Sequence, residues 1–491
     1  MNSLQKFIEN NNSSIKNSVF IISNDVKISY REFEKKVNNI SSYLKNKGIS
    51  EGDNVAIISE NNPDFILLIF SLWKLKAVPV PINIKLLTKE IEDKIIFADC
   101  SFVLVNKNTS VSLNHNSIKD RIILFPFNAE PSENTPRKKF NDNDTALILF
   151  TSGSSGKSKA VMLSFNNLIQ SNLIGNQILK QDNNDRWLAS LPFYHIGGFS
   201  IITRTFLSGA SVIIPDSLKV EDLINAIKKY KPTLASFVST QLQRLIENNT
   251  APNKELKNVL IGGGFTSNEL SLEAVKRGWK ITKVYGSTEV SSFVSAITSD
   301  DILKRPSSSG KALHPNEIFI VNEKKKNAPA NSRGEIVVKS SSVTKCYYKN
   351  PVETKKKLIN GFYYTGDIGY LDNEGYLFVE ARREDLIISG GENIVPKEVE
   401  SAILNHPSVD DCFVLGLENT EWGQETAAAV ALKKYEKISS TELKKFLKNK
   451  LAGYKIPRKI FFIDEIPKTS LGKVQKEKLL NLIRMHNSPT S

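Results

Sequence analysis

A loop of small polar residues at positions 147–159 is the clearest chemical signal in the sequence. After the apolar run 147–150 it contains Thr151, Ser152, Gly153, Ser154, Ser155, Gly156, Lys157 and Lys159. Backbone N–H groups and hydroxyls in such a loop can surround phosphate oxygens, and the ammonium groups balance their charge. A Walker P-loop is excluded, because that motif needs a glycine where Thr151 stands. Taken alone, the loop is either a phosphate site or a flexible surface segment.

Four further segments place hydroxyls, carboxylates and basic groups in expected turns and helix starts. They carry, in chain order, Tyr285, Thr288 and Glu289; Asp367; Arg382, Gly390 and Gly391; and Lys473. Each segment taken singly is explained as well by a β-turn or a solvated helix cap. Their common order and separations along one chain are very hard to obtain by chance.

Together these segments resemble the adenylate-forming superfamily of acyl-CoA synthetases, peptide-synthetase adenylation domains and beetle luciferases. The resemblance runs from about residue 29 to residue 473. It implies an ATP-dependent enzyme that adenylates a carboxylic acid and passes the acyl group to coenzyme A, with Mg²⁺ as the metal. The loop departs from the usual family pattern, which has Thr-Thr at Ser154 and Ser155, Pro at Ser158 and Gly at Ala160. Hydroxyls and lysines remain, so we expect the loop to function.

The resemblance also implies roles for the residues around the triphosphate. The loop from Thr151 to Lys159 would hold the β- and γ-phosphates, and Thr288 would donate to the α-phosphate. Glu289 would bind Mg²⁺, a hard cation that prefers carboxylate and phosphate oxygens. Lys473 would bridge the substrate carboxylate and the α-phosphate, two anions that must approach each other.

The resemblance also implies which residues bind the nucleoside of ATP and the thiol of coenzyme A. Asp367 would accept both ribose hydroxyls, with Arg382 nearby. Tyr285 would stack on adenine beside the backbone of three consecutive glycines, Gly262, Gly263 and Gly264. After adenylation the C-terminal domain would rotate about Glu384 and bring the turn of Gly390 and Gly391 to the pantetheine channel.

The acyl pocket is expected from segments 194–199, 240–244 and 262–264, which are similar to those of the o-succinylbenzoate–CoA ligase family of menaquinone biosynthesis. His195 would form part of the pocket wall, although a histidine before Gly-Gly can simply close a turn. The polar pair Thr240 and Gln241 could line the pocket, and Arg244 could either pair with a second carboxylate or point to solvent. The alternatives are another fatty or aryl acyl-CoA synthetase and an adenylation enzyme that loads a carrier protein.

Composition and charge narrow the class of protein further. Hydrophobic residues make up 40% and charged residues 24% of 491 residues, as in globular proteins of two or three domains. The net charge of +14 fits anionic small substrates as well as nucleic acid, and the lysine triplets 324–326 and 355–357 lack interleaved aromatic residues. We therefore expect no nucleic-acid partner. Three scattered cysteines, no apparent secretory signal and no full-length apolar span predict a cytoplasmic protein without stable membrane insertion, and homo-oligomerisation stays open.

Alternating helix-like and strand-like segments must position these residues. Ser29 and Glu32 have capping-box spacing, and apolar residues follow them at helical intervals. Strand-like runs at 55–59, 77–82 and 102–105 alternate with helix-like runs at 63–75 and 88–98, and three more strand–helix pairs lie within 212–229, 234–248 and 259–277. This alternation predicts an α/β fold with parallel sheets covered by helices.

Two changes of pattern predict the remaining organisation. Short alternating runs between residues 317 and 379 suggest a small β-rich unit, and a mixed region follows, with helices expected at 396–406, 439–451 and from 471 and strands at 413–417 and 426–432. Together with the resemblance, this predicts a large N-terminal AMP-binding domain at residues 1–381, made of two α/β subdomains and a small β-rich subdomain. A small, mobile α+β C-terminal domain is expected at residues 382–491.

Overall fold

The computed structural model describes residues 15–24, 26–109, 111–127, 141–151, 158–264, 266–322, 324–381, 387–394, 396–467, 474 and 476–487. The chain divides into two compact units, one built mainly from residues up to 382 and the other mainly from the residues after it. Each unit has its own buried apolar clusters.

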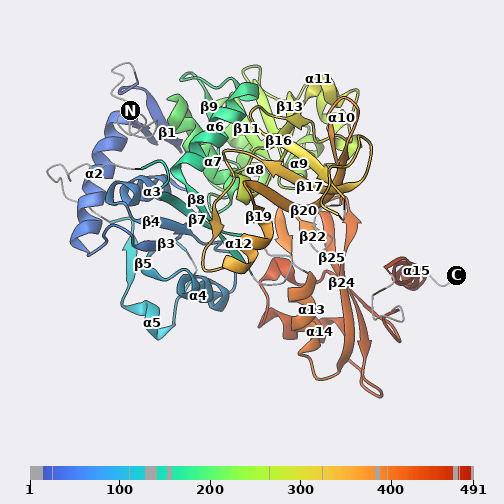
Figure 1. The fold of residues 1–491 in the computed structure, drawn as a ribbon. Coiled ribbons are helices and arrows are strands. Elements are labelled where there is room, and N and C mark those ends of the chain that lie inside the picture. The colour runs from blue at the N-terminus through green and yellow to red at the C-terminus, as the bar shows by residue number, and fades with distance from the viewer. Residues whose placement is uncertain are drawn as a thin grey trace. The chain divides into compact units, whose positions relative to one another are not determined.

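A nine-stranded sheet forms the centre of the larger unit (Figure 1). Its strand order is β15-β14-β13-β12-β11-β9-β10-β1-β2. The strands from β13 to β1 pair in parallel, whereas the pairs β1/β2, β13/β14 and β14/β15 are antiparallel. The bounds are β1 Val19–Ser23, β2 Val26–Ser29, β9 Arg186–Leu188, β10 Ser211–Ile214, β11 Leu234–Phe237, β12 Asn258–Ile261, β13 Ile281–Tyr285, β14 Ser295–Thr298 and β15 Lys311–Ala312.

Helices connect and cover the strands of this sheet, because parallel neighbours need a crossover connection. They are α6 Phe165–Leu179, α7 Ile196–Ser208, α8 Val220–Tyr230, α9 Ser239–Glu247, α10 Asn268–Lys276 and α11 Ser299–Ile302. The strand–helix pairs expected from the alternation in this part of the sequence are therefore confirmed.

A second sheet, β4-β3-β5-β6, is parallel throughout. Its strands are β3 Asn54–Ile58, β4 Val78–Pro81, β5 Cys100–Asn106 and β6 Ile122–Phe125, and its helices are α2 Tyr30–Asn46, α3 Pro63–Leu75, α4 Thr88–Phe97 and α5 Asn116–Lys119. The predicted capping box forms at the start of α2, where Ser29 Oγ accepts from Glu32 N at 3.2 Å and Ser29 N donates to Glu32 Oε2 at 2.8 Å. Figure 1 shows α2 and α3 side by side. The most apolar segment of the chain is α3, which is buried along almost its whole length.

Two antiparallel sheets complete the larger unit. A three-stranded sheet, β18-β8-β7, consists of β7 Thr145–Thr151, β8 Lys159–Ser164 and β18 Cys346–Tyr347. The predicted β-rich unit is a five-stranded sheet of β16 Glu317–Val321, β17 Gly334–Lys339, β19 Leu358–Ile359, β20 Phe362–Leu371 and β21 Leu377–Ala381, with helix α12 Pro351–Lys357 beside it.

The smaller unit combines one mixed sheet with three helices among its described residues. The sheet holds β22 Ile387–Ser389, β23 Glu392–Ile394, β24 Val409–Asn419, β25 Gly423–Leu432 and β26 Lys459–Phe462, and the helices are α13 Pro396–Leu404, α14 Ser440–Lys448 and α15 Lys476–Asn487. The α/β and α+β fold classes expected from the sequence are confirmed. The boundaries are less accurate: β24 and β25 extend beyond the predicted runs, because they form one long antiparallel ribbon. The last helix was predicted from residue 471, and α15 begins at Lys476.

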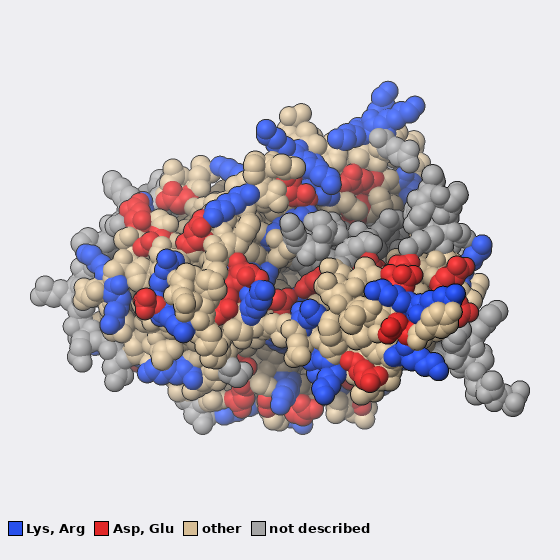
Figure 2. Space-filling view, turned by 90° about the horizontal axis from the view of Figure 1, so that it is seen from below, with Lys and Arg blue, Asp and Glu red and all other residues tan. Residues whose placement is uncertain are grey.

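The surface carries charges of both signs. On the face shown in Figure 2, Lys and Arg lie among Asp and Glu rather than in one continuous band of the described residues. None of the described helices is long and apolar enough to cross a membrane.

Candidate active site

Four loops meet at one edge of the nine-stranded sheet. The strands β13, β12, β11 and β9 are consecutive neighbours and run parallel. Their carboxyl ends therefore open to the same edge, which is where open α/β sheets bind ligands. The loops that follow these strands contain Gly286 to Glu289, Gly262 to Gly264, Val238 and residues 189–195. The fold thus places Thr288, Glu289 and the 262–264 glycines at the same sheet edge as part of the predicted pocket segment 194–199.

Thr288 and Glu289 lie in a single 3₁₀ turn, Thr288–Val290, directly after β13. Glu289 is 1% exposed, and its Oε1 accepts a hydrogen bond from the Tyr347 hydroxyl at 3.0 Å. The turn requires glycine at Gly286, because a Cβ there would lie 1.5 Å from the carbonyl oxygen of Ser292. A buried acidic residue thus sits at the sheet edge in a fixed backbone turn.

The hydroxyl of Ser287, the residue before Thr288, suggests that a ligand binds at this position. Ser287 Oγ is buried and has no hydrogen-bond partner among the described residues. Buried polar atoms in proteins are generally hydrogen-bonded, so this hydroxyl fits a site where a bound nucleotide supplies the acceptor. The described residues contain no cluster of three or more His, Cys, Asp and Glu side chains that could hold a metal ion. Mg²⁺ commonly takes one or two carboxylates and otherwise phosphate and water oxygens, so the single buried carboxylate of Glu289 is compatible with it.

Asp367 and Tyr285 form the second acidic site. Tyr285 is the last residue of β13, and its hydroxyl donates to Asp367 Oδ2 at 2.7 Å. Burial, followed by the negative charge of Asp367, raises the pKa of Tyr285 well above its ordinary value, so the hydroxyl remains a donor. The Tyr285 ring packs in an apolar cluster with Val290 and Ile336. The structure therefore gives Tyr285 a contact that the sequence did not suggest, while its stacking on adenine stays a prediction.

The phosphate loop itself, Ser152 to Lys157, lies outside the described residues. Its two ends are described: β7 and β8 pair antiparallel with Thr151 opposite Lys159. The loop therefore connects two strands, whereas a P-loop connects a strand to a helix. This agrees with the exclusion of a Walker motif. Lys159 is 7% exposed and forms an ion pair with Glu353 on α12. Its predicted contact with phosphate stays a prediction.

The predicted acyl-pocket residues His195 and Gln241 lie at the same sheet edge. His195 is the N-cap residue of α7, with its ring centroid 4.9 Å from that of Tyr194. Gly198 is required, since a Cβ there would lie 2.1 Å from the carbonyl oxygen of Pro192. The amide of Gln241, which could line the pocket, donates to Ser190 O at 2.9 Å and accepts from Val238 N at 3.2 Å, and its place in the pocket wall stays a prediction. Its side chain joins two of the loops at the sheet edge.

The three glycines after β12 support a close approach to the backbone. A Cβ on Gly262 would lie 2.8 Å from Val284 Cγ2, and Gly263 has a φ of 80°, which favours glycine. Gly264 continues the same loop. These positions are compatible with the predicted adenine site, because no side chain stands between the backbone and a flat ring.

Arg204 is a buried cation that the sequence reasoning missed. It lies on α7 and is 2% exposed, with its guanidinium 4.2 Å from the Phe293 ring centroid and its Nη2 donating to Ser171 Oγ at 3.3 Å. Burial lowers the pKa of Arg204 to about 9. Ser171 in turn donates to the carbonyl of Ser291, the residue that ends the Thr288–Val290 turn. An arginine within the apolar run of α7 was the signal that could have revealed it.

Besides the residues of the phosphate loop, the predicted site residues Arg382 and Lys473 lie outside the described residues, as does the expected hinge Glu384. In the smaller unit, Gly390 and Gly391 form the two-residue turn between β22 and β23, with φ values of 58° and 83°. Both values fit a type I′ hairpin turn, which glycine adopts without strain. Gly390 N donates to the carbonyl oxygen of Trp422, the residue before β25, at 3.0 Å, so the turn is held against the start of that strand.

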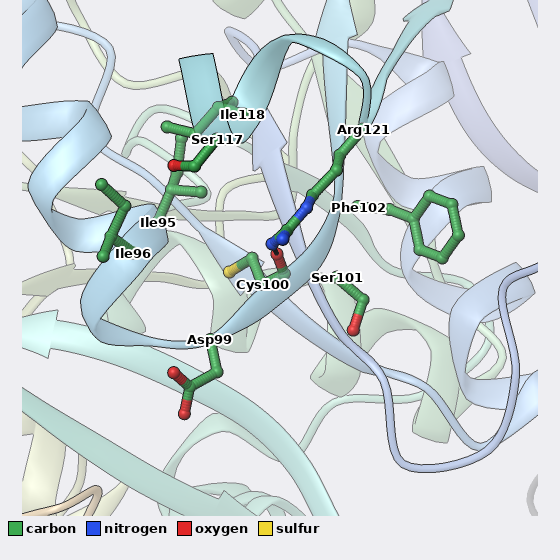
Figure 3. Close-up of a pocket in the computed structure, with 9 residues that line it drawn as sticks. All are labelled: Ile95, Ile96, Asp99, Cys100, Ser101, Phe102, Ser117, Ile118 and Arg121. Atoms are coloured by element: carbon green, nitrogen blue, oxygen red, sulfur yellow. Dashed lines mark hydrogen bonds between the residues drawn. The ribbon is translucent and has the colours of Figure 1, made fainter. Parts of the chain in front are cut away.

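A separate pocket of about 520 Å³ lies in the larger unit at the start of β5 (Figure 3). Arg121 reaches across it, and its Nη1 donates to Cys100 O at 3.3 Å. The residues that line it lie on α4, β5 and α5 or in the short segments next to them. They are Ile95, Ile96, Asp99, Cys100, Ser101, Phe102, Ser117, Ile118 and Arg121. None of them is a predicted site residue. The pocket lies at the amino end of β5, whereas ligands in such sheets bind at the carboxyl ends.

The loops at the sheet edge fit an α/β enzyme that binds a nucleotide, and the comparisons with known proteins agree. The sequence matches the AMP-binding enzyme family over residues 8–348 and the AMP-binding enzyme C-terminal domain over residues 398–473. The chain therefore belongs to the AMP-binding enzyme family.

Within that family, the chain is similar to 2-succinylbenzoate–CoA ligases. It is 33% identical to the enzyme of Geobacillus sp. (strain WCH70) over 461 residues, covering 93% of each chain, and 31% identical to that of Bacillus cytotoxicus, covering 95% of this chain and 96% of the relative. Among solved structures, it resembles o-succinylbenzoate CoA synthetase (MenE) from Bacillus subtilis. A double mutant bound to a product analogue gives a TM-score of 0.89 at 29% identity, covering 97% of this chain and 98% of the other. The same enzyme with ATP and magnesium ion gives 0.73 at 29% identity, covering 97% and 99%.

Proposed function

We propose that this protein is an AMP-forming 2-succinylbenzoate–CoA ligase. In the first half-reaction a carboxylate oxygen of the acid attacks the α-phosphorus of ATP, the bond to the β-phosphate breaks and pyrophosphate leaves. In the second, the sulfur of CoA attacks the acyl carbon, the acyl–oxygen bond breaks, AMP leaves and the thiol proton is lost to solvent. The observation that carries this proposal is the set of four loops at one sheet edge, which gathers Glu289, Thr288, the 262–264 glycines and His195.

We assign the nucleotide to this edge of the sheet. Glu289 would hold Mg²⁺, which neutralises phosphate charge, and Thr288 would donate to the α-phosphate. Asp367 would accept the ribose hydroxyls, and it is buried with its carboxylate already oriented by Tyr285. Lys473 and the loop from Thr151 to Lys159 would contribute the positive charge that the attack of one anion on another needs.

We further propose that residues 382–491 act as a mobile domain. The two half-reactions need different groups at the reacting carbon, because a lysine that bridges the acid and ATP would obstruct an incoming thiol. A rotation about Glu384 would exchange Lys473 for the turn of Gly390 and Gly391. Glu384→Pro should then leave adenylation running and block thioester formation, because proline fixes φ and restricts the change in dihedral angles that a hinge needs.

The substrate is the most specific part of the proposal. It is supported by the relatives named 2-succinylbenzoate–CoA ligase and by the structures of the Bacillus subtilis enzyme. The acid carries an aromatic carboxylate, a ketone and the reacting succinyl carboxylate, so its pocket needs hydrogen-bonding groups at both ends. Such a pocket strongly rejects analogues that lack these hydrogen-bonding groups.

Pyrophosphate release with o-succinylbenzoate, benzoate and octanoate, each with and without CoA, tests the proposal. We expect o-succinylbenzoate to have the highest kcat/KM and to yield a CoA thioester. A preference for octanoate would contradict the proposed substrate but would leave the assignment as an acid–CoA ligase in place. Formation of the acyl-adenylate without transfer to CoA would instead favour an enzyme that loads a carrier protein.

We also propose that the protein acts in the cytoplasm, which is supported by the free cysteines Cys100, Cys346 and Cys412.

A further inference from the structure

A buried series of four side chains connects the strand after the phosphate loop to the acidic residue of the 3₁₀ turn. Glu353 on α12 pairs with Lys159 at the start of β8. The Lys159 ammonium lies 5.8 Å from the centroid of the Tyr347 ring, within cation–π range. The Tyr347 hydroxyl donates to Glu289 Oε1 at 3.0 Å. Three of the four residues are less than 9% exposed, and Glu353 has a side chain 14% exposed.

The position of Tyr347 is determined on several sides. Its strand β18 pairs with β8, where Tyr347 is opposite Val161. Its backbone N–H donates to Thr354 Oγ1 at 3.0 Å, which joins it to α12. The ring is 3% exposed. A hydroxyl on so constrained a ring can point in few directions, so it orients whatever group accepts its hydrogen bond.

The same stretch of chain also holds the backbone of the 3₁₀ turn. Thr344 N donates to Glu289 O at 2.7 Å, and Ser342 Oγ donates to Val290 O at 3.0 Å. Residues 342–347 therefore fix both the backbone and the carboxylate of Glu289. Hydrogen bonds to a metal-binding carboxylate orient it, and their loss commonly costs 10- to 100-fold in metal affinity or activity.

We infer that Tyr347 is a positioning residue for the Mg²⁺ carboxylate of Glu289, and that the Lys159–Glu353 ion pair holds the Tyr347 ring in place. The inference rests on the proposed function, because that proposal gives Glu289 its role. It adds a residue that does not touch substrate or metal and acts through another side chain. It also gives Lys159 a task that does not require contact with phosphate.

The test compares two adjacent tyrosines. Tyr347→Phe removes the hydroxyl and keeps the ring over which Lys159 lies. Tyr348→Phe is the matched control, because the Tyr348 hydroxyl donates to Asp99 at 2.9 Å instead of to Glu289. Mn²⁺, used in place of Mg²⁺, is followed by electron paramagnetic resonance during its binding to the full-length protein with α,β-methylene ATP. Pyrophosphate release is measured over a range of Mg²⁺ concentrations, and thermal unfolding checks the fold of each variant.

We expect Tyr347→Phe to weaken Mn²⁺ binding about 10-fold and to raise the half-saturating Mg²⁺ concentration by a similar factor. The kcat at saturating Mg²⁺ should recover to within a few-fold of the wild type. Tyr348→Phe should change both affinities less than 2-fold. Glu353→Gln should weaken Mn²⁺ binding in the same direction by a smaller factor, since the Tyr347 ring loses part of its support.

Wild-type Mn²⁺ affinity in Tyr347→Phe would overturn the inference. So would a rate defect in Tyr347→Phe that added Mg²⁺ does not relieve, or an equal loss of Mn²⁺ affinity in Tyr348→Phe, because a purely structural role predicts either. The proposed function is tested separately by the wild type. A protein that binds Mn²⁺ with the nucleotide but releases no pyrophosphate with o-succinylbenzoate would contradict the proposed substrate, while a Tyr347-specific loss of Mn²⁺ affinity would still support the inference.

Discussion

The hydrogen bond between Tyr285 and Asp367 offers a direct test of the nucleoside site. Tyr285→Phe removes one oxygen atom from a ring that is 3% exposed and leaves its packing with Val290 and Ile336 in place. The Asp367 carboxylate then loses the donor at 2.7 Å that fixes its direction. Because Asp367 is proposed to accept the ribose hydroxyls, a misdirected carboxylate should weaken ATP binding.

The expected loss of ATP affinity is estimated from the negative charge of the acceptor, the Asp367 carboxylate. Hydrogen bonds to ionised groups are worth about 1.5–3 kcal/mol. Part of that energy is lost equally from the free and the ATP-bound protein, so only the reorientation of Asp367 affects binding. We therefore expect a loss of about 1.4 kcal/mol of ATP-binding free energy, which is roughly 10-fold in affinity.

The assay is calorimetric titration with ATP and with 2′,3′-dideoxy-ATP. Wild type should prefer ATP, and Tyr285→Phe should lose most of that preference while binding the dideoxy nucleotide almost normally. Tyr364→Phe is the control, because Tyr364 lies on the same strand β20 as Asp367 and alternates to the less buried face. Unchanged discrimination between the two nucleotides in Tyr285→Phe would refute the reasoning, and an equal loss of affinity for both would point to a general disturbance of the fold.

Three further outcomes are expected. Glu353→Gln should lower the free energy of unfolding by about 3 kcal/mol, because it leaves the Lys159 ammonium buried without its carboxylate. Lys283 lies on β13, and burial lowers its pKa from 10.5 to about 8. Between these two pH values the unfolded chain therefore binds more protons than the folded protein. The contribution of Lys283 to the free energy of unfolding consequently rises with pH in this range. Lys283→Met should therefore stabilise the protein at pH 7 by roughly 2 kcal/mol, with the difference shrinking towards pH 10.5. Lys473→Ala should reduce adenylation by about 10²-fold or more and spare thioester formation from supplied acyl-adenylate.

Each of these outcomes has its own check. Chemical denaturation of Glu353→Gln is compared with Glu317→Gln, whose pair with Lys339 is half exposed and should contribute under about 1 kcal/mol. Similar losses in both variants would contradict the argument from burial. For Lys283→Met, denaturation at pH 7 and pH 10 is compared, and a difference from wild type that does not change with pH would contradict the pKa shift. Equal loss of both half-reactions in Lys473→Ala would show that this lysine is structural.

Local features of this protein were predictable because they depend on residues close in sequence. The start of α2 follows from Ser29 and Glu32, three residues apart, whose reciprocal hydrogen bonds form as expected. The alternation of apolar runs predicted parallel sheets with helical crossovers, since short-range periodicity distinguishes strands from helices. The turn at Gly390 and Gly391 was predictable for the same reason. Helix and strand ends were less accurate, as for α15, because pairing partners outside the segment decide where an element stops.

Family resemblance went further than periodicity, since it predicted which residues form the site, although not which neighbours contact them. Glu289 and Asp367 were both named from their motifs, yet neither motif indicated which side chain would orient each carboxylate. Gln241 gives a further example. Its residue type suggested that it could line the pocket, which stays a prediction, but nothing in the sequence indicated that its amide would hydrogen-bond Ser190 and Val238.

Only the tertiary structure decided which distant residues share the site. Tyr347 reaches Glu289 across 58 residues of chain, and Lys159 meets Glu353 across 194. These contacts exist because β18 pairs with β8 and because β8 contacts the 3₁₀ turn and α12 contacts β18. A sequence pattern reports the preference of a segment for helix or strand and for burial. The choice of partner strand depends on the whole set of apolar faces that must be buried at once, and that choice places the tyrosine over the carboxylate.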